Sequence, residues 1–342
     1  MARVDLTVRG GGAFGLCIAW EAARRGARVR LIEAERIGAG SSGGIVGALS
    51  PHVPENWNPK KAFQLESLLM AEGFWDEVTR VSGLPTGYGR VGRLQPLADE
   101  AAVRLARQRG ETAKALWQGR AEWRVIPTLG GAWEPASPSG FLVEDTLSAR
   151  LHPRMAAEAL VEAIRSAGGE VVLGDAVNEG PVIWATGMQG LRDLSADIGR
   201  PIGDGVKGQA ISLRFEARSA PQLFADSLHI IPHADGTVAI GSTSEPVWVE
   251  DSVTDGQLET VYARAIKALP ALAKAPILER WAGVRPRAKT RAPLLGHWPR
   301  RAGHFVANGG FKIGFGMAPK VAEVMVDLVL EDQDDIPEGF RL

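Results

Sequence analysis

The sequence predicts an α/β protein of two domains, one with a parallel sheet wound with helices and one an α+β domain built on an antiparallel sheet. Three observations lead to this prediction. Residues 4–33 read as strand, glycine turn, helix and second strand. Residues 210–215 and 228–241 alternate apolar and polar side chains, and Asp235-Gly236 in the second stretch is a strong hairpin signal. The length of 342 residues is too large for one ordinary core.

Composition limits the class of protein further. Hydrophobic residues make up 45% and charged residues 23% of the chain, as in globular domains. The net charge of −1, from 39 basic and 40 acidic residues, argues against a global nucleic-acid or membrane-binding surface. Cys17 is the single cysteine, which excludes an intrachain disulfide and a cysteine metal cluster. No apolar run has the length of a membrane span and no basic-apolar leader precedes Val4, so we expect a cytoplasmic protein without a metal.

The first turn has the spacing of a dinucleotide-binding motif. Gly10, Gly12 and Gly15 form G-x-G-x-x-G between two expected strands. The first glycine permits a tight turn, the second lets backbone N–H groups approach a pyrophosphate, and the third lets the helix pack close to the strand. Glu33 ends the second strand, where its carboxylate can accept from ribose hydroxyls and would repel a 2′-phosphate. The motif therefore predicts FAD or NAD. Arg9 departs from the apolar residue that is expected before the turn.

The segment after the second strand favours FAD over NAD. Residues 39–48 carry almost no bulky side chain, so their backbone can lie against a large flat ligand and bond its phosphates and sugar. An NAD enzyme does not need such a segment at this point. FAD extends further along the chain, so we expect FAD.

These stretches resemble a known family. The run Gly10-Gly11-Gly12-Ala13-Phe14-Gly15, with Glu33 and Gly40-Ser41-Ser42-Gly43, resembles the D-amino-acid oxidase family of FAD-dependent oxidoreductases, and within it the glycine oxidase-like members. Gly47-Ala48-Leu49-Ser50-Pro51 is also similar to the FAD half of the bifunctional tRNA wobble-uridine enzyme. The resemblance spans nearly the whole chain. It implies a Rossmann-like FAD-binding domain and a substrate domain, as in the glutathione-reductase-like fold.

The resemblance implies a non-covalent FAD site assembled from separate parts of the chain. In the family, the Ala-Thr-Gly at 185–187 ends a strand against the cofactor, and Val177 is expected to touch adenine. A glycine-rich turn at 308–316 closes the site, and no cysteine lies there to attach the flavin. The expected cofactor-binding residues are Gly10, Gly12, Ala13, Phe14, Gly15, Glu33, Ala34, Ser41, Ser42, Gly43, Gly47, Val177, Ala185, Thr186, Gly187, Gly309, Gly310, Phe311, Lys312, Ile313 and Gly314.

Residues 280–301 hold seven basic residues and no acid. Three interpretations stay open: a nucleic-acid patch, a solvated face, or one arginine that points inward. Trp281-Ala282-Gly283-Val284-Arg285-Pro286 resembles the family segment whose arginine binds the substrate carboxylate, which implies that role for Arg285. Arginine suits the role because its planar fork makes two parallel charge-assisted bonds to a carboxylate.

Two further side chains are candidates for the chemistry. His229 alternates with Leu228 and Ile230, so it points to the opposite face of its strand. It is a proton acceptor or an orienting group if that face is the active site, and an ordinary surface or core histidine otherwise. Glycine oxidase has a tyrosine in the matching place. Lys312 matches an arginine of glycine oxidase, which implies either a second cation near flavin and substrate or a side chain that only orients a backbone carbonyl.

The resemblance implies FAD-dependent oxidation of the C–N bond of an amino acid or N-substituted glycine. Hydride would pass from Cα to flavin N5, the imine would be hydrolysed to an oxo acid, and dioxygen or another acceptor would reoxidise the flavin. One alternative is a tRNA wobble-uridine modification oxidase acting on a carboxymethylaminomethyl group. Others are a D-amino acid dehydrogenase with a non-oxygen acceptor and a flavin-binding protein without activity. The exact substrate, its stereochemistry and the oligomeric state stay open, and the near-neutral charge disfavours a nucleic-acid partner.

The pattern along the chain also predicts the division into domains. Residues 128–140 are rich in Gly, Pro and Trp and read as a loop that crosses between domains. Apolar periodicity and Pro319 predict five helices, at residues 60–82, 99–119, 151–166 and 255–269 and after Pro319. The resemblance divides the chain into an FAD domain of residues 1–80, 140–205 and 283–342 and a substrate domain of residues 81–139 and 206–282.

Overall fold

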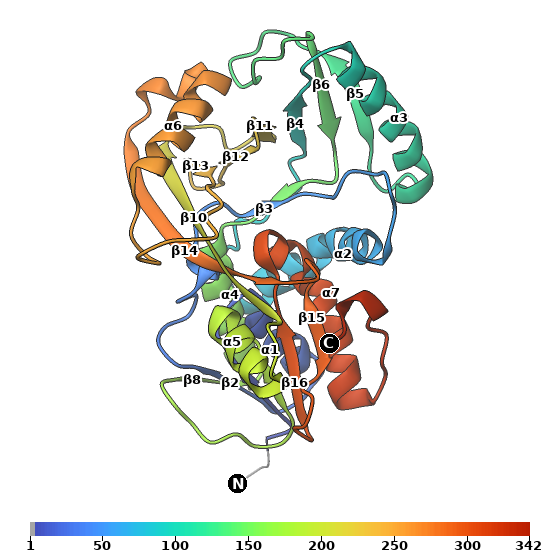
Figure 1. The fold of residues 1–342 in the computed structure, drawn as a ribbon, viewed down its shortest axis with the longest axis vertical. Coiled ribbons are helices and arrows are strands. Elements are labelled where there is room, and N and C mark those ends of the chain that lie inside the picture. The colour runs from blue at the N-terminus through green and yellow to red at the C-terminus, as the bar shows by residue number, and fades with distance from the viewer. Residues whose placement is uncertain (1–3) are drawn as a thin grey trace.

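The computed structural model describes residues 4–342 as two lobes that meet along one face (Figure 1). The lower lobe is built on a six-stranded sheet and the upper lobe on an eight-stranded sheet. Two strands of twelve residues each, β10 (Gly203–Arg214) and β14 (Ile277–Ala288), pair with one another and run from one lobe to the other. The two-domain α/β prediction is confirmed.

The six-stranded sheet of the lower lobe has the order β15-β16-β9-β1-β2-β8. Its pairs are parallel except at the β15 edge, where β15 is antiparallel to β16. Parallel neighbours need crossover connections, which is why the strands come from three distant parts of the chain. The strands are β1 (Leu6–Arg9), β2 (Val29–Glu33), β8 (Glu170–Leu173), β9 (Val182–Trp184), β15 (Leu294–His297) and β16 (His304–Asn308).

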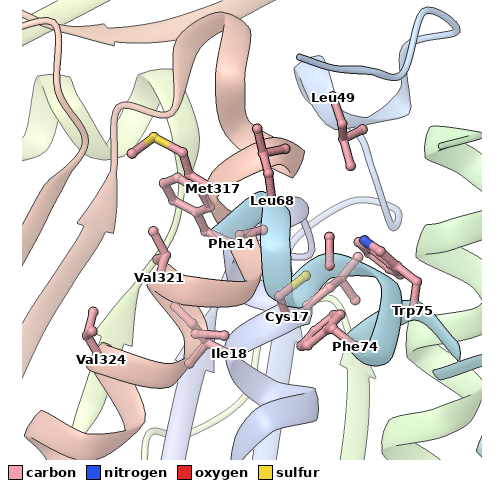
Figure 2. Packing of buried hydrophobic residues seen from close by; sticks show 14 of the residues in the cluster. Phe14, Cys17, Ile18, Leu49, Leu68, Phe74, Trp75, Met317, Val321 and Val324 are labelled. Atoms are coloured by element: carbon pink, nitrogen blue, oxygen red, sulfur yellow. The ribbon is translucent and has the colours of Figure 1, made fainter. Parts of the chain in front are cut away.

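One face of this sheet carries the main core. Helix α1 (Ala13–Arg24) packs there against α7 (Gly314–Val326), which brings the two ends of the chain together. Figure 2 shows Phe14 and Ile18 of α1 facing Met317 and Val321 of α7. These side chains are at most 7% exposed, so hydrophobic burial fixes α1 behind the glycine turn.

The opposite face explains Arg9. Its guanidinium bonds Asn178 Oδ1 at 2.7 Å and Asp175 Oδ1 at 2.8 Å, and it stacks over the ring of Trp184. The loop between β8 and β9 therefore lies across β1 and is held there by polar contacts. An apolar residue at position 9 could not make these bonds.

The eight-stranded sheet of the upper lobe has the order β14-β10-β13-β12-β11-β4-β6-β5 and is antiparallel except between β11 and β4. Helix α6 (Gly256–Ala268) covers one face, where Leu258 and Val261 pack with the strands. The other face is turned toward the first lobe. The remaining strands are β4 (Arg93–Pro96), β5 (Trp123–Pro127), β6 (Phe141–Asp145), β11 (Gln222–Ala225), β12 (Leu228–Pro232) and β13 (Thr237–Gly241). A two-stranded pair of β3 (Ala48–Leu49) and β7 (Ala149–Arg150) lies between the two larger sheets.

Four predicted helices are confirmed, and the hairpin of β12 and β13 turns at Asp235-Gly236 as predicted. Among helices of residues 4–342, none combines the length and apolar character that crossing a bilayer requires. Cys17 is buried in α1. The confirmed helices are α2 (Pro59–Ser82), α3 (Glu100–Trp117), α4 (Pro153–Ser166) and α6.

Three expectations are corrected. Pro319 does not open the last helix, because α7 begins at Gly314 and contains Pro319, whose cost to the helix is outweighed by its buried packing. Helix α5 (Gly187–Ile198) was not predicted, because Gly187, which opens it, reads as the glycine turn after a strand. Residues 128–140 do not cross between domains, since they join the antiparallel partners β5 and β6 of one sheet.

Sheet membership also moves an expected domain boundary. Strand β6 pairs with β4 and β5 in the upper sheet, although residues 140–205 were expected to belong wholly to the FAD domain. Strand pairing therefore places residues 141–145 with the upper sheet. The remainder of the expected division stays a prediction.

Candidate active site

The glycine turn has the geometry that its sequence predicts. Gly10 has φ +109°, and a Cβ there would lie 2.4 Å from Ala185 O. A Cβ on Gly15 would lie 1.9 Å from Gly10 O, so any side chain at that position would push α1 away from β1. The turn leads directly into α1, and Gly12 at its N-terminus supplies no side-chain cap. The positive end of the helix dipole thus lies at the glycine turn, as an anion site requires.

Two side chains hold the entrance to this turn. The Glu33 carboxylate accepts from Gly11 N–H at 2.6 Å and from Glu35 N–H at 3.0 Å. Ser42, in the short helix η1 (Ser41–Gly43), accepts from Ala13 N–H at 2.9 Å. The acid at the end of β2 and the small-residue segment that follows are therefore brought to the same helix N-terminus, with Ala34 exposed beside them.

Other expected cofactor residues are distributed unevenly. Ala185 contacts the glycine turn, and Thr186 begins α5 with a buried hydroxyl that has no hydrogen-bond partner in residues 4–342. The side chain of Phe14 packs in the core rather than toward the turn (Figure 2). Val177 is 77% exposed in the β8–β9 loop, where its carbonyl accepts from Arg30. Its contact with adenine stays a prediction.

A cavity of about 360 Å³ joins the cofactor residues to the substrate residues. The lower lobe contributes the N-terminus of α1 and the segment around η1, and the upper lobe contributes β12, β13 and β14. Expected residues that line it are Ala13, Ser41, Ser42, Gly47, Phe311, Lys312, Gly314, His229 and Arg285. The structure therefore brings all three proposed catalytic residues to one cavity.

Arg285 is 9% exposed and its guanidinium is fixed by neutral groups. Nη2 donates to Ser242 Oγ at 2.6 Å and Nη1 donates to Thr243 O at 3.4 Å. Burial lowers the pKa of Arg285 to about 10, with the Glu245 carboxylate partly opposing this, so the side chain is still a cation at neutral pH. A buried cation held by neutral partners can accept a carboxylate as its counter-ion.

Gly208 provides the room for that guanidinium. It lies on β10, in register with Gly283 of β14, and a Cβ added to it would lie 2.0 Å from Arg285 Nη1. We expect Gly208→Ala to displace Arg285 and to lower kcat/KM by at least about tenfold, because a misplaced positioning group of this kind loses productive geometry. Steady-state kinetics beside circular dichroism tests this. Unchanged kcat/KM in the folded variant would contradict the packing argument.

Lys312 also lines the cavity. It lies in the short helix η3 (Phe311–Ile313) that follows β16. Arg287 of β14 bridges to Gly310, so Arg285 and Lys312 each lie two residues from this bridge and their side chains enter the same space. Desolvation and the neighbouring Arg285 lower the pKa of Lys312 from its ordinary value.

His229 faces the cavity as its alternation with Leu228 and Ile230 predicts. Burial and the nearby cations Arg93, Lys312 and Arg285 lower its pKa to about 3. The imidazole is therefore neutral at neutral pH and is too weak a base to store a proton there. Its buried Nδ1 has no partner within residues 4–342, which leaves an orienting hydrogen bond as its available role.

A second histidine supports the cavity wall from behind. His233 is 1% exposed, and its Nε2 bonds the carbonyl of Ile45, which lines the cavity. Burial lowers its pKa to about 4, while the carbonyl bond partly opposes this. The wall formed by residues 44–48 is thus tied to β12 by a neutral imidazole.

Acid should weaken the fold through this group. An unfolded histidine takes a proton near pH 6.5, whereas folded His233 takes one only near pH 4, so stability is full above pH 6.5 and falls as pH decreases. The slope is about 1.4 kcal/mol per pH unit for each extra proton bound by the unfolded chain. We expect His233→Gln, which can still donate to Ile45, to flatten urea-unfolding stability between pH 7 and 5. An equally steep profile would contradict this origin.

The residues fit FAD on several independent grounds. The glycine turn allows a close backbone approach, Glu33 lies beside it, and the Thr186 hydroxyl is buried without a partner. Gly44 and Gly47 leave no room for a side chain in the cavity wall. A Cβ at Gly44 would meet Trp281, and a Cβ at Gly47 would meet the Leu151 carbonyl. The cavity then continues to Arg285, where a substrate would lie next to the cofactor.

Sequence reasoning missed several residues of the site. Phe224, Ser227, Ser242 and Trp281 also line the cavity. Trp281 was quoted only as part of a segment, although its place four residues before Arg285 was a usable signal. Asp226 and Ser227 both have positive φ in the tight β11–β12 turn, and neither residue type by itself predicts this conformation.

Three of the basic residues of 280–301 have different surroundings. Arg285 lines the cavity, Arg280 pairs with Glu259 at the far end of β14, and Arg301 pairs with Asp197 at 3.3 Å. These three side chains therefore have separate partners. The interpretation with one inward arginine is the one that the geometry matches.

The fold and the site define a dinucleotide-binding flavoprotein with a second sheet over the cavity. The model of the family of FAD dependent oxidoreductases named DAO matches residues 5–328. The chain belongs to this family, and the predicted family, fold and FAD cofactor are confirmed.

Several characterised proteins are similar to this chain. The bifunctional protein ThiO/ThiG of Nostoc sp. is 28% identical over 362 residues, which cover 97% of this chain and 53% of that protein. The chain thus spans about half the length of the ThiO/ThiG relatives that it matches. Glycine oxidase of Geobacillus kaustophilus is 25% identical over 370 residues, 96% of this chain and 93% of that protein.

Solved structures show the same fold. A crystal structure of glycine oxidase from Geobacillus kaustophilus has a TM-score of 0.86 with 23% identity, and the match covers 100% of this chain and 99% of that one. Iminodiacetate oxidase from Chelativorans sp. has a TM-score of 0.85 with 23% identity, and the match covers 98% of each chain. At these identities the likeness establishes the fold alone, and the substrate has to be inferred from the residues of the site.

Proposed function

We propose that this protein oxidises the C–N bond of an amino acid or an N-substituted glycine. The observation that carries the proposal is Arg285, a buried cation with only neutral hydrogen-bond partners, in the cavity that begins at the dinucleotide turn. Membership in the FAD-dependent family and similarity to proteins named glycine oxidase and iminodiacetate oxidase support it.

The protein's part in the reaction is orientation. Arg285 holds the substrate carboxylate, which fixes the position of Cα in the cavity, and such positioning supplies several kcal/mol of a barrier, on the order of 7 in favourable cases. His229 is neutral and can accept or donate one hydrogen bond to the amine. The apolar wall of Ile45, Val46 and Phe224 excludes water from the reacting carbon. FAD, when bound, supplies the acceptor for the hydride that leaves Cα.

The bonds balance without an acid–base side chain when the amine is bound in its neutral form. The Cα–H bond breaks and its electron pair leaves with the hydride, the amine nitrogen shares its lone pair with Cα, and an N–H proton is lost to water. The imine takes up water to give an oxo acid and a free amine. We also propose a cytoplasmic location, since the chain has one cysteine and that residue is buried.

Anaerobic reduction of the bound flavin tests the function. We would follow flavin absorbance while adding glycine, sarcosine, larger N-substituted glycines, D-amino acids and D- and L-proline one at a time. We expect at least one amine to bleach the flavin. Return of the flavin absorbance in air would identify dioxygen as an acceptor. Full flavin content with no bleaching by any amine would refute amine oxidation. Bleaching only by a larger N-substituted glycine would favour the tRNA alternative.

A further inference from the structure

The cavity has an unbalanced charge. Arg285 and Lys312 both line it, and among residues 4–342 no aspartate or glutamate does. His229 adds nothing to the charge, because its pKa is about 3. The lining therefore carries two positive charges and no negative charge at neutral pH.

The two cations also lack acidic partners at short range. Arg285 bonds only Ser242 and Thr243, and within residues 4–342 Lys312 makes no hydrogen bond or ion pair, its ammonium lying 5.7 Å from the centre of the Phe311 ring. The buried cation just behind the cavity is treated differently, since Arg93 pairs with Asp145 at 2.8 Å. Glu245 acts on Arg285 without a hydrogen bond and partly opposes the effect of burial on its pKa, whereas among residues 4–342 no carboxylate pairs with Lys312.

We propose that the substrate carries two carboxylates, one bound by Arg285 and the second bound by Lys312. The inference deepens the proposed amine oxidation and rests on it. A monocarboxylate neutralises one of the two charges and leaves the other without a partner, whereas a dicarboxylate pairs both. Arg285 on β14 and Lys312 in η3 lie on the same side of the antiparallel Arg287–Gly310 bridge and line the same cavity, so one small molecule can reach both.

The substrate class is therefore an amino acid or N-substituted glycine with a second carboxylate. Lysine suits the second position because its ammonium is a flexible point charge, while the fork of Arg285 fixes the first carboxylate next to the reacting carbon. The competing role for Lys312 is to compensate negative charge on the cofactor alone. The two roles differ in whether the second charge of the substrate matters.

A matched pair of substrates separates the roles in the holoenzyme. N-(carboxymethyl)glycine and its monoamide have the same shape and differ by one carboxylate, and aspartate and asparagine form a second such pair. We expect the dicarboxylate of at least one pair to have a kcat/KM about 10- to 150-fold higher, as one charge-assisted hydrogen bond contributes. Lys312→Gln should remove most of this preference and Lys312→Arg should keep it.

Lys289→Gln is the control variant. Lys289 is exposed on the same basic stretch and does not line the cavity, so its substitution removes one charge and should leave the preference intact. Flavin content and the midpoint potential of the bound flavin are measured for each variant.

Three results would overturn the inference. The first is that the wild type turns over the amide and the dicarboxylate equally well in both pairs. The second is Lys312→Gln lowering kcat/KM by the same factor for both members of a pair while shifting the flavin potential, which assigns Lys312 to the cofactor. The third is oxidation of glycine or D-amino acids but of no dicarboxylate, which leaves the proposed function standing. Absence of flavin reduction by every amine refutes the proposed function itself.

Discussion

Replacing Arg285 with methionine is expected to lower kcat/KM for any amino acid substrate by about 30- to 5,000-fold, which corresponds to about 2–5 kcal/mol. Methionine fills similar space but cannot donate, so the substrate carboxylate would be left in a buried pocket without a counter-ion. Ser242 and Thr243 would also lose their donor. The effect should include kcat, because the arginine orients Cα as well as binding the substrate.

Two companion variants make this result specific. Arg285→Lys keeps a charge but not the two-pronged fork, so we expect a loss between wild type and methionine. Arg280→Met removes an arginine of the same strand that pairs with Glu259 outside the cavity, and its kinetics should match the wild type. The pH profile should agree: kcat/KM should fall as pH rises through about 10, where Arg285 and Lys312, both with pKa values lowered by burial, lose their protons. Full activity in Arg285→Met with normal FAD content would disprove the carboxylate assignment.

Gly15→Ala is expected to have the largest effect on the fold and on FAD content. The added Cβ would lie 1.9 Å from Gly10 O and 3.0 Å from Gly10 C, which are backbone atoms of the turn and cannot rotate away. Helix α1 would have to move off β1, although Phe14 and Ile18 fix it in the core. We expect a loss of about 3 kcal/mol or more of unfolding free energy, at the upper end of overpacking effects, and a protein that retains little FAD.

The matched control is the same substitution at an open site. Gly73 lies in α2, is exposed, and has no atom within 4 Å of an added Cβ. Gly73→Ala should raise stability by about 0.5–1 kcal/mol, because alanine loses less backbone entropy in a helix. Chemical denaturation and the ratio of absorbance at 450 and 280 nm measure both variants. If Gly15→Ala proved as stable and as yellow as Gly73→Ala, close packing of the turn would not be its function.

Much of the fold could be predicted from the sequence, because the features concerned depend on interactions between residues near one another in the chain. The glycine turn was predictable because only glycine fits between Gly10 O, Ala185 O and α1. The acid at Glu33 was predictable because it ends the strand beside that turn. The helices and the β12–β13 hairpin were predictable from apolar periodicity and from Asp-Gly, since both signals act over a few residues. The expected role of Arg285 follows from the resemblance of residues 281–286 to a segment of the family, and it stays a prediction.

Tertiary structure alone decided what depends on distant parts of the chain. The strength of His229 as a base was not readable, because its pKa of about 3 comes from burial and from Arg93, Lys312 and Arg285 on other elements. The start of α7 was misjudged because burial of Pro319 overrides its local preference. The role of Gly208 in making room for the Arg285 guanidinium could not be predicted, because it depends on the pairing of β10 with β14. The charge of the cavity likewise emerged only after β14 and η3 had been brought together, since electrostatics and packing depend on distance in space rather than on position in the chain.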